Sequence, residues 1–410
     1  MIRDIALAHG DDPALRGRLR PYQLKALEAI ASCGTEAAGM HVEVCDQCSD
    51  HRMMPNTCCN RSCPHCQGRE RAAWVEARMQ ELLPCGYFHA VLTSPAELRP
   101  LTLMCPAVLL AIFMKAASDA IDYLCRKPDY LGAEVGQLAI LHTWKRDLGW
   151  HPHVHIIVTA GGWDAAQQRW IPARTYGRDK KAFLLPVDVL RAAFQRRMMK
   201  LVLRAYRRGD FGKNPGDTHP ALVDANALAR HLTASMKKTW VIRIEPPFGG
   251  PEQLLKYLGA YINRVAISPK RILAHDPQAG TVTYTWTTNA KPNTVQQATL
   301  PAVEFLARFA QHILPPRFQR IRFRGLWSTA HRATKLQVVQ QALAINRAPL
   351  PPPSPPPEPR RDLCATCGLG HYHRMLGPCT RPSQSERRRI IALIRNARRT
   401  ATPVEATTAA

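Results

Sequence analysis

Three histidines occupy alternate positions in one short stretch of the chain. His151, His153 and His155 are followed by an apolar run at 156–158 and a glycine pair at 161–162. A β-strand places residues i, i+2 and i+4 on the same face, so the three imidazole rings share a face if this stretch is a strand. Neutral imidazoles that share a face can bind one metal ion. The alternative is that they are surface residues without a ligand.

The residues before these histidines predict a partner strand. Residues 138–144 are mostly apolar, carry His142 and lead through a polar turn at 145–149 into the histidine stretch. Two strands joined by such a turn are typical of a β-hairpin. The apolar run after His155 predicts a buried central strand. The hairpin therefore places the histidines where a core meets a cleft.

Two Cys-x2-Cys pairs near the start of the chain indicate a zinc site. Cys45 and Cys48 form the first pair, and Cys63 and Cys66 form the second. Each pair supplies two thiolates from one tight turn, and four thiolates complete a tetrahedral shell around zinc. We expect one structural zinc ion at these four residues, with Cys58 as an alternative ligand or the ligand of a further metal.

Basic residues surround this predicted zinc module, Arg61 among them. Their charge favours contact with phosphates, so we expect the module to bind DNA; the alternative is that the zinc only stabilises the fold. A proline-rich linker at 349–359 leads into a tail with further candidate ligands. These are Cys364, Cys367, His371, His373 and Cys379. Their spacing is irregular, so a second zinc site and the absence of one are both open.

Two tyrosines four residues apart stand on a predicted helix that Pro251 opens. Tyr257 and Tyr261 share one face of this helix, and Arg264 follows about one turn later. A lone tyrosine pair at this spacing is more often a pair of core aromatics than a pair of nucleophiles. The spacing alone therefore leaves both interpretations open.

Arginines alternate with apolar residues at 317–324. If this segment is a strand, Arg320, Arg322 and Arg324 share a face. Such a row suits contact with DNA phosphates, and a solvated edge strand is the alternative.

Charge and composition favour a nucleic-acid partner. The chain of 410 residues has 56 Lys and Arg against 31 Asp and Glu, for a net charge of +25. Such an excess favours a polyanion. The chain has 13 cysteines and no recognisable export signal, which favours metal ligands or free thiols in a reducing cytoplasm. The most apolar run, 101–114, is too short to cross a bilayer, so we expect no membrane partner.

Taken together, these motifs resemble those of a known family. The chain is similar over about residues 20–330 to the two-tyrosine, rolling-circle-type insertion-sequence transposases of the HUH nuclease superfamily. The segments that carry the resemblance are 45–67, 88–98, 142–144, 151–155, 240–253 and 257–268.

The resemblance implies a mechanism and a set of site residues. His153 and His155 are expected to bind Mg²⁺ or Mn²⁺ with a third ligand, for which His142 is favoured over His89 and His151. Tyr257 and Tyr261 are expected to attack DNA and form a 5′-phosphotyrosine bond, without a nucleotide cofactor. Arg264 or, alternatively, Lys256 is our own suggestion for the cation that assists the phenol.

The resemblance also implies a fold. We expect an α+β protein with an HUH-nuclease-like antiparallel sheet flanked by helices, an N-terminal four-cysteine zinc module and a flexible C-terminal tail. The predicted parts are an N-terminal helical segment at 1–40, the zinc module at 41–70, the catalytic domain at 71–335, and the linker and tail at 336–410.

The predicted function is a transposase that cuts and rejoins single-stranded DNA at insertion-sequence ends and at the target. Its expected location is the cytoplasm of a prokaryotic-type cell, associated with the nucleoid. One alternative is a non-catalytic, zinc-dependent DNA-binding protein. A further alternative is a metallohydrolase that binds zinc through His151, His153 and His155. The sequence predicts no oligomeric state.

Overall fold

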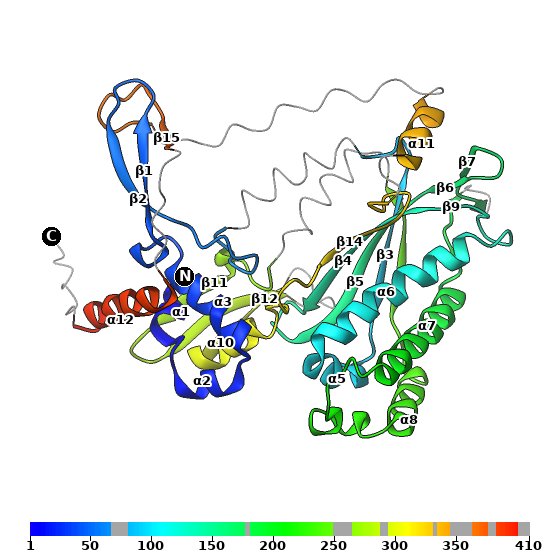
Figure 1. The fold of residues 1–410 in the computed structure, drawn as a ribbon, viewed down its shortest axis with the longest axis horizontal. Coiled ribbons are helices and arrows are strands. Elements are labelled where there is room, and N and C mark those ends of the chain that lie inside the picture. Colours follow the sequence, from blue (N-terminus) through cyan, green and yellow to red (C-terminus); the bar gives the residue numbers. More distant parts are fainter. Residues whose placement is uncertain are drawn as a thin grey trace. The chain divides into compact units, whose positions relative to one another are not determined.

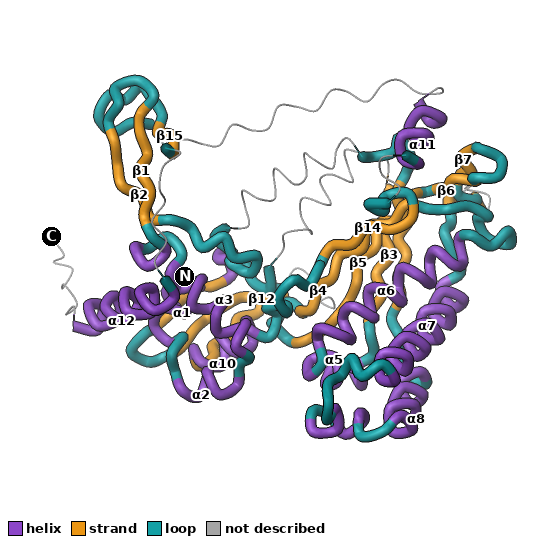
Figure 2. The backbone as a smooth tube through the Cα atoms, viewed as in Figure 1, coloured by secondary structure: helices purple, strands orange, loops and turns teal. Residues whose placement is uncertain are grey.

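The computed structural model describes residues 1–66, 81–176, 181–248, 265–287, 294–330, 334–344, 363–375 and 383–400 (Figure 1). The chain divides into two compact units. The smaller unit combines residues 1–70, 267–313 and 355–410, and the larger combines 71–266 and 314–354. Both units contain helices and antiparallel sheets (Figure 2), so the predicted α+β class is confirmed.

The larger unit is built on a five-stranded sheet in which every neighbouring pair is antiparallel. In spatial order the strands are β10 (Ile242–Phe248), β3 (Tyr87–Thr93), β5 (Trp150–Thr159), β4 (Gly136–Trp144) and β14 (Ile321–Gly325). β4 and β5 are consecutive in the chain and pair directly, which confirms the predicted hairpin. β5 lies at the centre of the sheet, as its apolar run predicts.

Helices cover one face of this sheet. Figure 1 shows α6 (Pro106–Cys125) and α7 (Val187–Arg207) along that face, with α5 (Arg99–Met104) and α8 (Ala225–Met236) beside them. The rings of Phe113 and Phe194 meet edge to face between α6 and α7, with centroids 5.4 Å apart. Burying side chains of this size contributes about 1.5–3 kcal/mol each, so this layer is the main core of the unit.

The opposite face of the sheet has two parts. One part is a second apolar core, in which Tyr87 stacks on Trp327 with ring centroids 5.9 Å apart. α11 (Lys335–Ala344) contributes Leu336 and Val339 to this core. The other part carries the histidines of β4 and β5. Two small hairpins complete the unit: β6 (Gly161–Asp164) with β7 (Arg169–Pro172), and β8 (Thr175–Tyr176) with β9 (Lys181–Ala182).

The smaller unit packs helices on a three-stranded sheet. The sheet consists of β11 (Ile272–Asp276), β12 (Thr281–Thr287) and β13 (Val295–Pro301), and the helices are α1 (Ile2–His9), α2 (Pro13–Arg18), α3 (Pro21–Ser32) and α10 (Ala302–Ala310). α1, α2 and α3 all lie in the N-terminal segment at 1–40 that is predicted to be helical. The Gln23 amide donates to the Ala310 carbonyl at 2.8 Å, which joins α3 to the end of α10.

A second sheet of the smaller unit joins the two ends of the chain. β1 (Met40–Cys45) pairs with β2 (His51–Pro55) on one side and with β15 (Tyr372–Arg374) on the other. α12 (Gln384–Thr400) packs near α1 and α3, and its Arg388 bonds Glu28 at 2.9 Å. Parts of the predicted tail therefore fold together with the predicted zinc module. None of the helices in the described part of the chain combines the length and the apolar character needed to cross a bilayer.

Candidate functional site

Sheet register brings three histidines together on the open part of the larger sheet. His142 of β4 pairs directly with His153 of β5, and His155 follows two residues later on the same face. The candidate ligand nitrogens of His142, His153 and His155 all lie within 4.8 Å of one another. The ring centroids of His142 and His155 are 4.6 Å apart. We call these three residues the histidine group. Of the three candidates for the third position, His142 is the one that belongs to it.

Hydrogen bonds determine which nitrogen of His153 carries the proton. His153 Nδ1 lies 2.8 Å from the carbonyl oxygen of His151. A carbonyl oxygen only accepts hydrogen bonds, so Nδ1 must donate. In the neutral ring the lone pair is then on Nε2, and this is the atom that can bind a cation.

A longer chain of hydrogen bonds does the same for His155. Glu245 Oε2 lies 2.9 Å from His89 Nδ1, and His89 Nε2 lies 2.9 Å from His155 Nδ1. The carboxylate accepts from His89 Nδ1–H, so His89 Nε2 accepts from His155 Nδ1–H. Burial lowers the pKa of His89, although Glu245 opposes the shift, which favours the neutral ring that this scheme requires. The lone pair of His155 is therefore on Nε2.

Two members of the histidine group are buried and the third is partly exposed. His142 and His155 are only 2% and 7% exposed, and His153 is half-buried. The indole of Trp144 stacks on His142 with ring centroids 4.6 Å apart, which restrains that imidazole. Of the three histidines, His153 is thus the one with the most exposed side chain.

His151 lies beside the histidine group and is not a member of it. Its pKa is lowered to about 4, first because it is buried and then because His153 is close, so the ring is neutral at physiological pH. The pairing of β4 and β5 shifts register between His142 and Trp144. The shift lies between the His142–His153 pair and the Trp144–Trp150 pair, so the regular pairing ends before it reaches His151. The third member of the group is His142. The predicted set of His151, His153 and His155 is therefore not the set that the structure brings together.

The predicted nucleophiles, Tyr257 and Tyr261, lie outside the described residues, and so do the candidates for the assisting cation, Arg264 and Lys256. β10 ends at Phe248, and the segment with both tyrosines follows it directly in sequence. The roles of these four residues stay predictions.

The predicted arginine row lies on the other face of the sheet. Arg322 pairs with Ala139 and Arg324 with Gln137, both of which face the helices. The Arg322 guanidinium donates to the carbonyls of Ala111 and Gln319, at 3.2 and 3.3 Å. Arg322 and Arg324 lie on the same face of β14, as predicted, and Arg320 immediately precedes the strand. DNA binding by Arg320, Arg322 and Arg324 stays a prediction, and the sheet separates this row from the histidines.

The structure sorts eight cysteines into two groups of four. The first cysteine group consists of Cys33, Cys58, Cys63 and Cys66, and the second of Cys45, Cys48, Cys364 and Cys367. Within each group the four sulfur atoms lie within 4.8 Å of one another. The predicted single site at Cys45, Cys48, Cys63 and Cys66 is therefore wrong.

The length of the β1–β2 hairpin keeps Cys45 and Cys48 apart from Cys63 and Cys66. Cys45 ends β1 at the tip of the hairpin, whereas Cys63 follows the return of β2 to its base. A strand rises about 3.3 Å per residue, so β1 separates tip from base by about 16 Å. At the base, Gly34 N–H donates to the Asn56 carbonyl at 3.0 Å, which holds Cys33 near Cys58.

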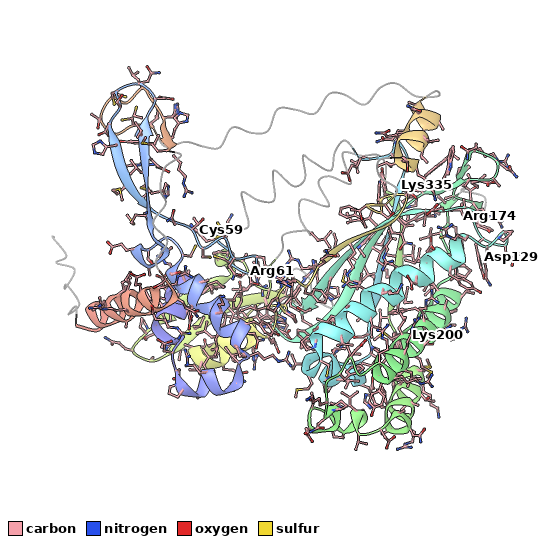
Figure 3. The ribbon with its side chains drawn as sticks, in the orientation of Figure 1. Cys59, Arg61, Asp129, Arg174, Lys200 and Lys335 are labelled. Atoms are coloured by element: carbon pink, nitrogen blue, oxygen red, sulfur yellow. The ribbon has the colours of Figure 1, made fainter. Side chains whose placement is uncertain are left out.

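Cys33 is not among the predicted ligands, and Cys58 is predicted only as an alternative ligand or as the ligand of a further metal, whereas both belong to the first cysteine group. Cys33 has no cysteine within two or three residues, so it is not part of a Cys-x2-Cys pair. The sequence does carry one indication of it: Cys58, Cys63 and Cys66 make three ligands, and a structural zinc ion needs a fourth. Arg61, predicted to contact DNA, is an exposed residue in the same loop (Figure 3), and its role stays a prediction.

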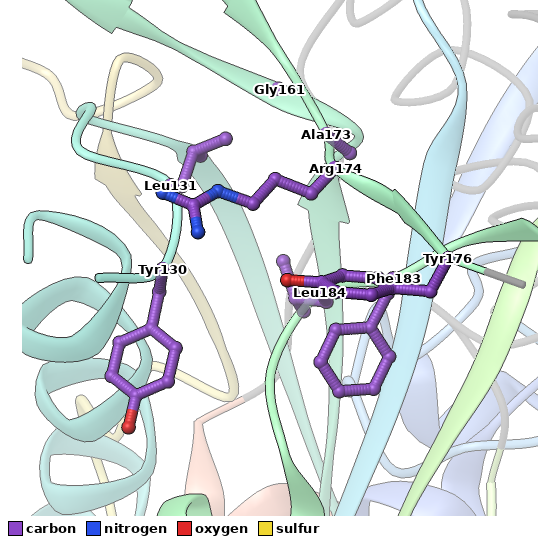
Figure 4. Close-up of a pocket in the computed structure, with 8 residues that line it drawn as sticks. All are labelled: Tyr130, Leu131, Gly161, Ala173, Arg174, Tyr176, Phe183 and Leu184. Carbon is purple, nitrogen blue, oxygen red and sulfur yellow. The ribbon is translucent and has the colours of Figure 1, made fainter. Parts of the chain in front are cut away.

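A pocket at the far end of the central strand does not compete with the histidine group. It lies beyond the end of β5, with Gly161, Tyr130, Phe183 and Arg174 among its lining residues (Figure 4). Its volume is about 20 Å³, enough for about one water molecule. Arg174 donates to the carbonyls of Pro128 and Asp129, at 2.6 and 2.8 Å. A substrate-sized ligand does not fit there.

Comparison with known proteins identifies the family. Residues 5–94 match the family described as "Transposase zinc-binding domain", and residues 136–335 match the one described as "Putative transposase". The chain is 36% identical over 346 residues to the protein described as "Putative transposase y4qJ" of Sinorhizobium fredii, covering 84% of each chain. The chain belongs to the two-tyrosine insertion-sequence transposases. The predicted family is thus confirmed.

A second relative agrees with this assignment. The transposase is 30% identical over 335 residues to the transposase for insertion sequence element IS801 of Pseudomonas savastanoi pv. phaseolicola, covering 80% of this chain and 76% of that one. No solved structure matches it. Family membership makes DNA its partner, and the matched zinc-binding domain, which contains the whole first cysteine group, supports Zn²⁺ as its structural metal.

Proposed function

We propose that the transposase cuts and rejoins single-stranded DNA at the ends of its insertion sequence through a 5′-phosphotyrosine intermediate. The observation that carries the proposal is the convergence of His142, His153 and His155 at one end of the sheet. A basic protein of this charge attracts the DNA backbone, and the histidine group offers a point at which one phosphate can be held.

The donor set fits a divalent transition metal ion. His153 and His155 each direct a lone pair from Nε2, and His142 completes three nitrogen donors. Of the two expected ions, Mg²⁺ is the harder and is held almost entirely by oxygen ligands, so three nitrogen donors favour Mn²⁺ over Mg²⁺. When bound, such an ion supplies Lewis-acid polarisation of the scissile phosphate.

Neighbouring residues position the donors. Glu245 orients His89, and His89 orients His155, so the lone pair of His155 Nε2 stays directed at the group. Carboxylates behind ligating histidines typically change metal affinity or activity by about 10- to 100-fold. We therefore assign Glu245 and His89 as positioning residues.

The tyrosines supply the nucleophile in this proposal. The phenol oxygen of Tyr257 or Tyr261 attacks phosphorus, a phosphorus–oxygen bond to tyrosine forms, and the bond to the DNA 3′ oxygen breaks. The phenol proton is lost to solvent and the leaving 3′ oxygen is protonated to a hydroxyl. Because a free phenol has a pKa of about 10, a cation must favour the phenolate, and Arg264 is the candidate. Two tyrosines four residues apart in the sequence permit two successive transfers.

The test is formation of a covalent adduct. Full-length transposase with Mn²⁺ and labelled single-stranded end DNA should give a protein-linked product on a denaturing gel. Tyr257→Phe with Tyr261→Phe should abolish it, and the exposed control Tyr123→Phe should retain it. An adduct that survives the double substitution rejects these nucleophiles. Cleavage without an adduct would favour a metallohydrolase, and binding without cleavage would favour a DNA-binding protein.

A further inference from the structure

The second cysteine group joins two segments that are distant in sequence. Cys45 and Cys48 belong to the β1–β2 hairpin, and Cys367 is 322 positions beyond Cys45. The matched zinc-binding family segment covers residues 5–94 and does not reach Cys364 or Cys367. We propose that this group binds a second zinc ion, so that the C-terminal tail completes a site begun by the N-terminal hairpin.

The sulfur geometry fits a tetrathiolate site. The Sγ atoms of Cys45 and Cys367 are 3.8 Å apart, and those of Cys48 and Cys364 are 3.6 Å apart. A tetrahedral zinc ion with Zn–S bonds of about 2.3 Å places its sulfur ligands about 3.8 Å from one another. A disulfide would need about 2.05 Å, so these pairs are arranged as ligands.

Backbone groups support both halves of the site. Gln47 N–H donates to Cys45 Sγ at 3.4 Å, and Gly370 N–H donates to Cys367 Sγ at 3.3 Å. Such bonds stabilise the charged thiolate that zinc requires. A Cβ at position 370 would lie 2.5 Å from Cys45 Sγ. Only glycine lets the tail backbone approach the hairpin cysteine this closely.

Two aspartates of the hairpin turn hold the tail in place. Asp46 accepts from the backbone N–H of His371 and from His373 Nε2, both at 2.8 Å. Asp50 accepts from the hydroxyls of Tyr372 and Thr366, at 2.6 and 2.9 Å. His371 and His373 thus belong to the docking contacts, and their irregular spacing relative to the cysteines no longer argues against a zinc site.

Further contacts show that the docking does not depend on the cysteines alone. β15 pairs with β1 through Cys45 and Tyr372, and the Arg52 guanidinium lies 3.9 Å above the Tyr372 ring. Cys45 and Cys364 are 3% and 1% exposed. The sheet therefore holds the thiols at zinc spacing, with Cys45 and Cys364 buried, Cys367 partly buried and Cys48 exposed. Four thiolates fill all four positions of a structural zinc site.

The test counts zinc in the full-length protein by mass spectrometry of the metal. Wild type should hold two equivalents, and Cys364→Ser with Cys367→Ser should hold one. Cys59→Ser is the matched control, because Cys59 is exposed and belongs to neither group (Figure 3); it should keep two. One equivalent in wild type, or two in the Cys364 and Cys367 variant, would overturn the proposal.

Combined substitutions test the grouping itself. Adding Cys45→Ser to the tail variant should remove no further zinc, because both changes affect one site. Adding Cys33→Ser should remove the remaining equivalent, because it affects the first cysteine group. The opposite pattern would contradict the assignment of ligands.

Thiol alkylation separates local loss of zinc from general unfolding. In the tail variant, Cys45 and Cys48 should become reactive, and the first cysteine group should stay protected. Reactivity of both groups would contradict a second, separate site. None of these measurements involves DNA cleavage, and the loss of one equivalent between wild type and the tail variant does not depend on the metal at the histidine group.

Discussion

The histidine group and the second cysteine group are both assembled by antiparallel strand pairing, yet the sequence encodes them differently. The three histidines lie on two consecutive strands, so one short hairpin determines their register. The four cysteines require β15 to return to β1 from the other end of the chain. A site built on a local hairpin can be read from spacing, whereas a site built on a distant pairing requires the fold.

The two groups also differ in what surrounds the donor atoms. Behind the histidines is a chain of polar side chains that ends at Glu245 and orients lone pairs toward the group, whose His153 is partly exposed. Around the cysteines, backbone N–H groups and two aspartates close the site. The first arrangement suits a catalytic ion that must meet substrate, and the second suits a structural ion.

The largest expected effect tests membership of the histidine group. His142→Ala should reduce Mn²⁺-dependent cleavage by about 10³-fold, on the order of 4 kcal/mol, because it removes a direct ligand. His151→Ala should change the rate by less than about tenfold, because that ring is outside the group. Rates measured under single-turnover conditions compare the two, with zinc content unchanged in both. Equal losses would remove the distinction between these residues.

An intermediate effect is expected from the chain of polar side chains. Glu245→Ala should weaken Mn²⁺ activation by about 10- to 100-fold, since His89 no longer holds His155 in one tautomer. Glu245→Gln should recover part of this loss, because its amide oxygen can still accept from His89 Nδ1. Metal titrations of the cleavage rate measure both. A glutamine variant as impaired as the alanine variant would point to charge as the deciding property.

The smallest expected effect concerns the close approach at the second cysteine group. Gly370→Ala should weaken zinc binding there by about tenfold. The added methyl group clashes with the Cys45 sulfur, and relieving the clash costs about 1.4 kcal/mol of binding free energy. Gly17→Ala is the matched control, because a Cβ at that position meets nothing within 4 Å. Competition with a chelator measures the affinity of each site. Equal chelator resistance in both variants would show that glycine is not needed at position 370.

Local patterns predicted much of the larger unit. Alternation of apolar residues and histidines indicated the β4–β5 hairpin, and the pairing of His142 with His153 follows from it. The alternation of Arg322 and Arg324 was also predicted. Which face they occupy was not, because a strand pattern gives two faces without saying which one the helices cover.

Residues close together in the chain are enough to predict the ligand types, the Cys-x2-Cys pairs, the histidine strand and the family. Which Cys-x2-Cys pairs share a metal ion depends instead on how distant strands pair. Cys-x2-Cys pairs are chemically equivalent, so their spacing cannot distinguish one partner from another. The length of the β1–β2 hairpin separates Cys45 from Cys63, and the pairing of β1 with β15 brings Cys364 and Cys367 to the place that Cys63 and Cys66 were expected to fill.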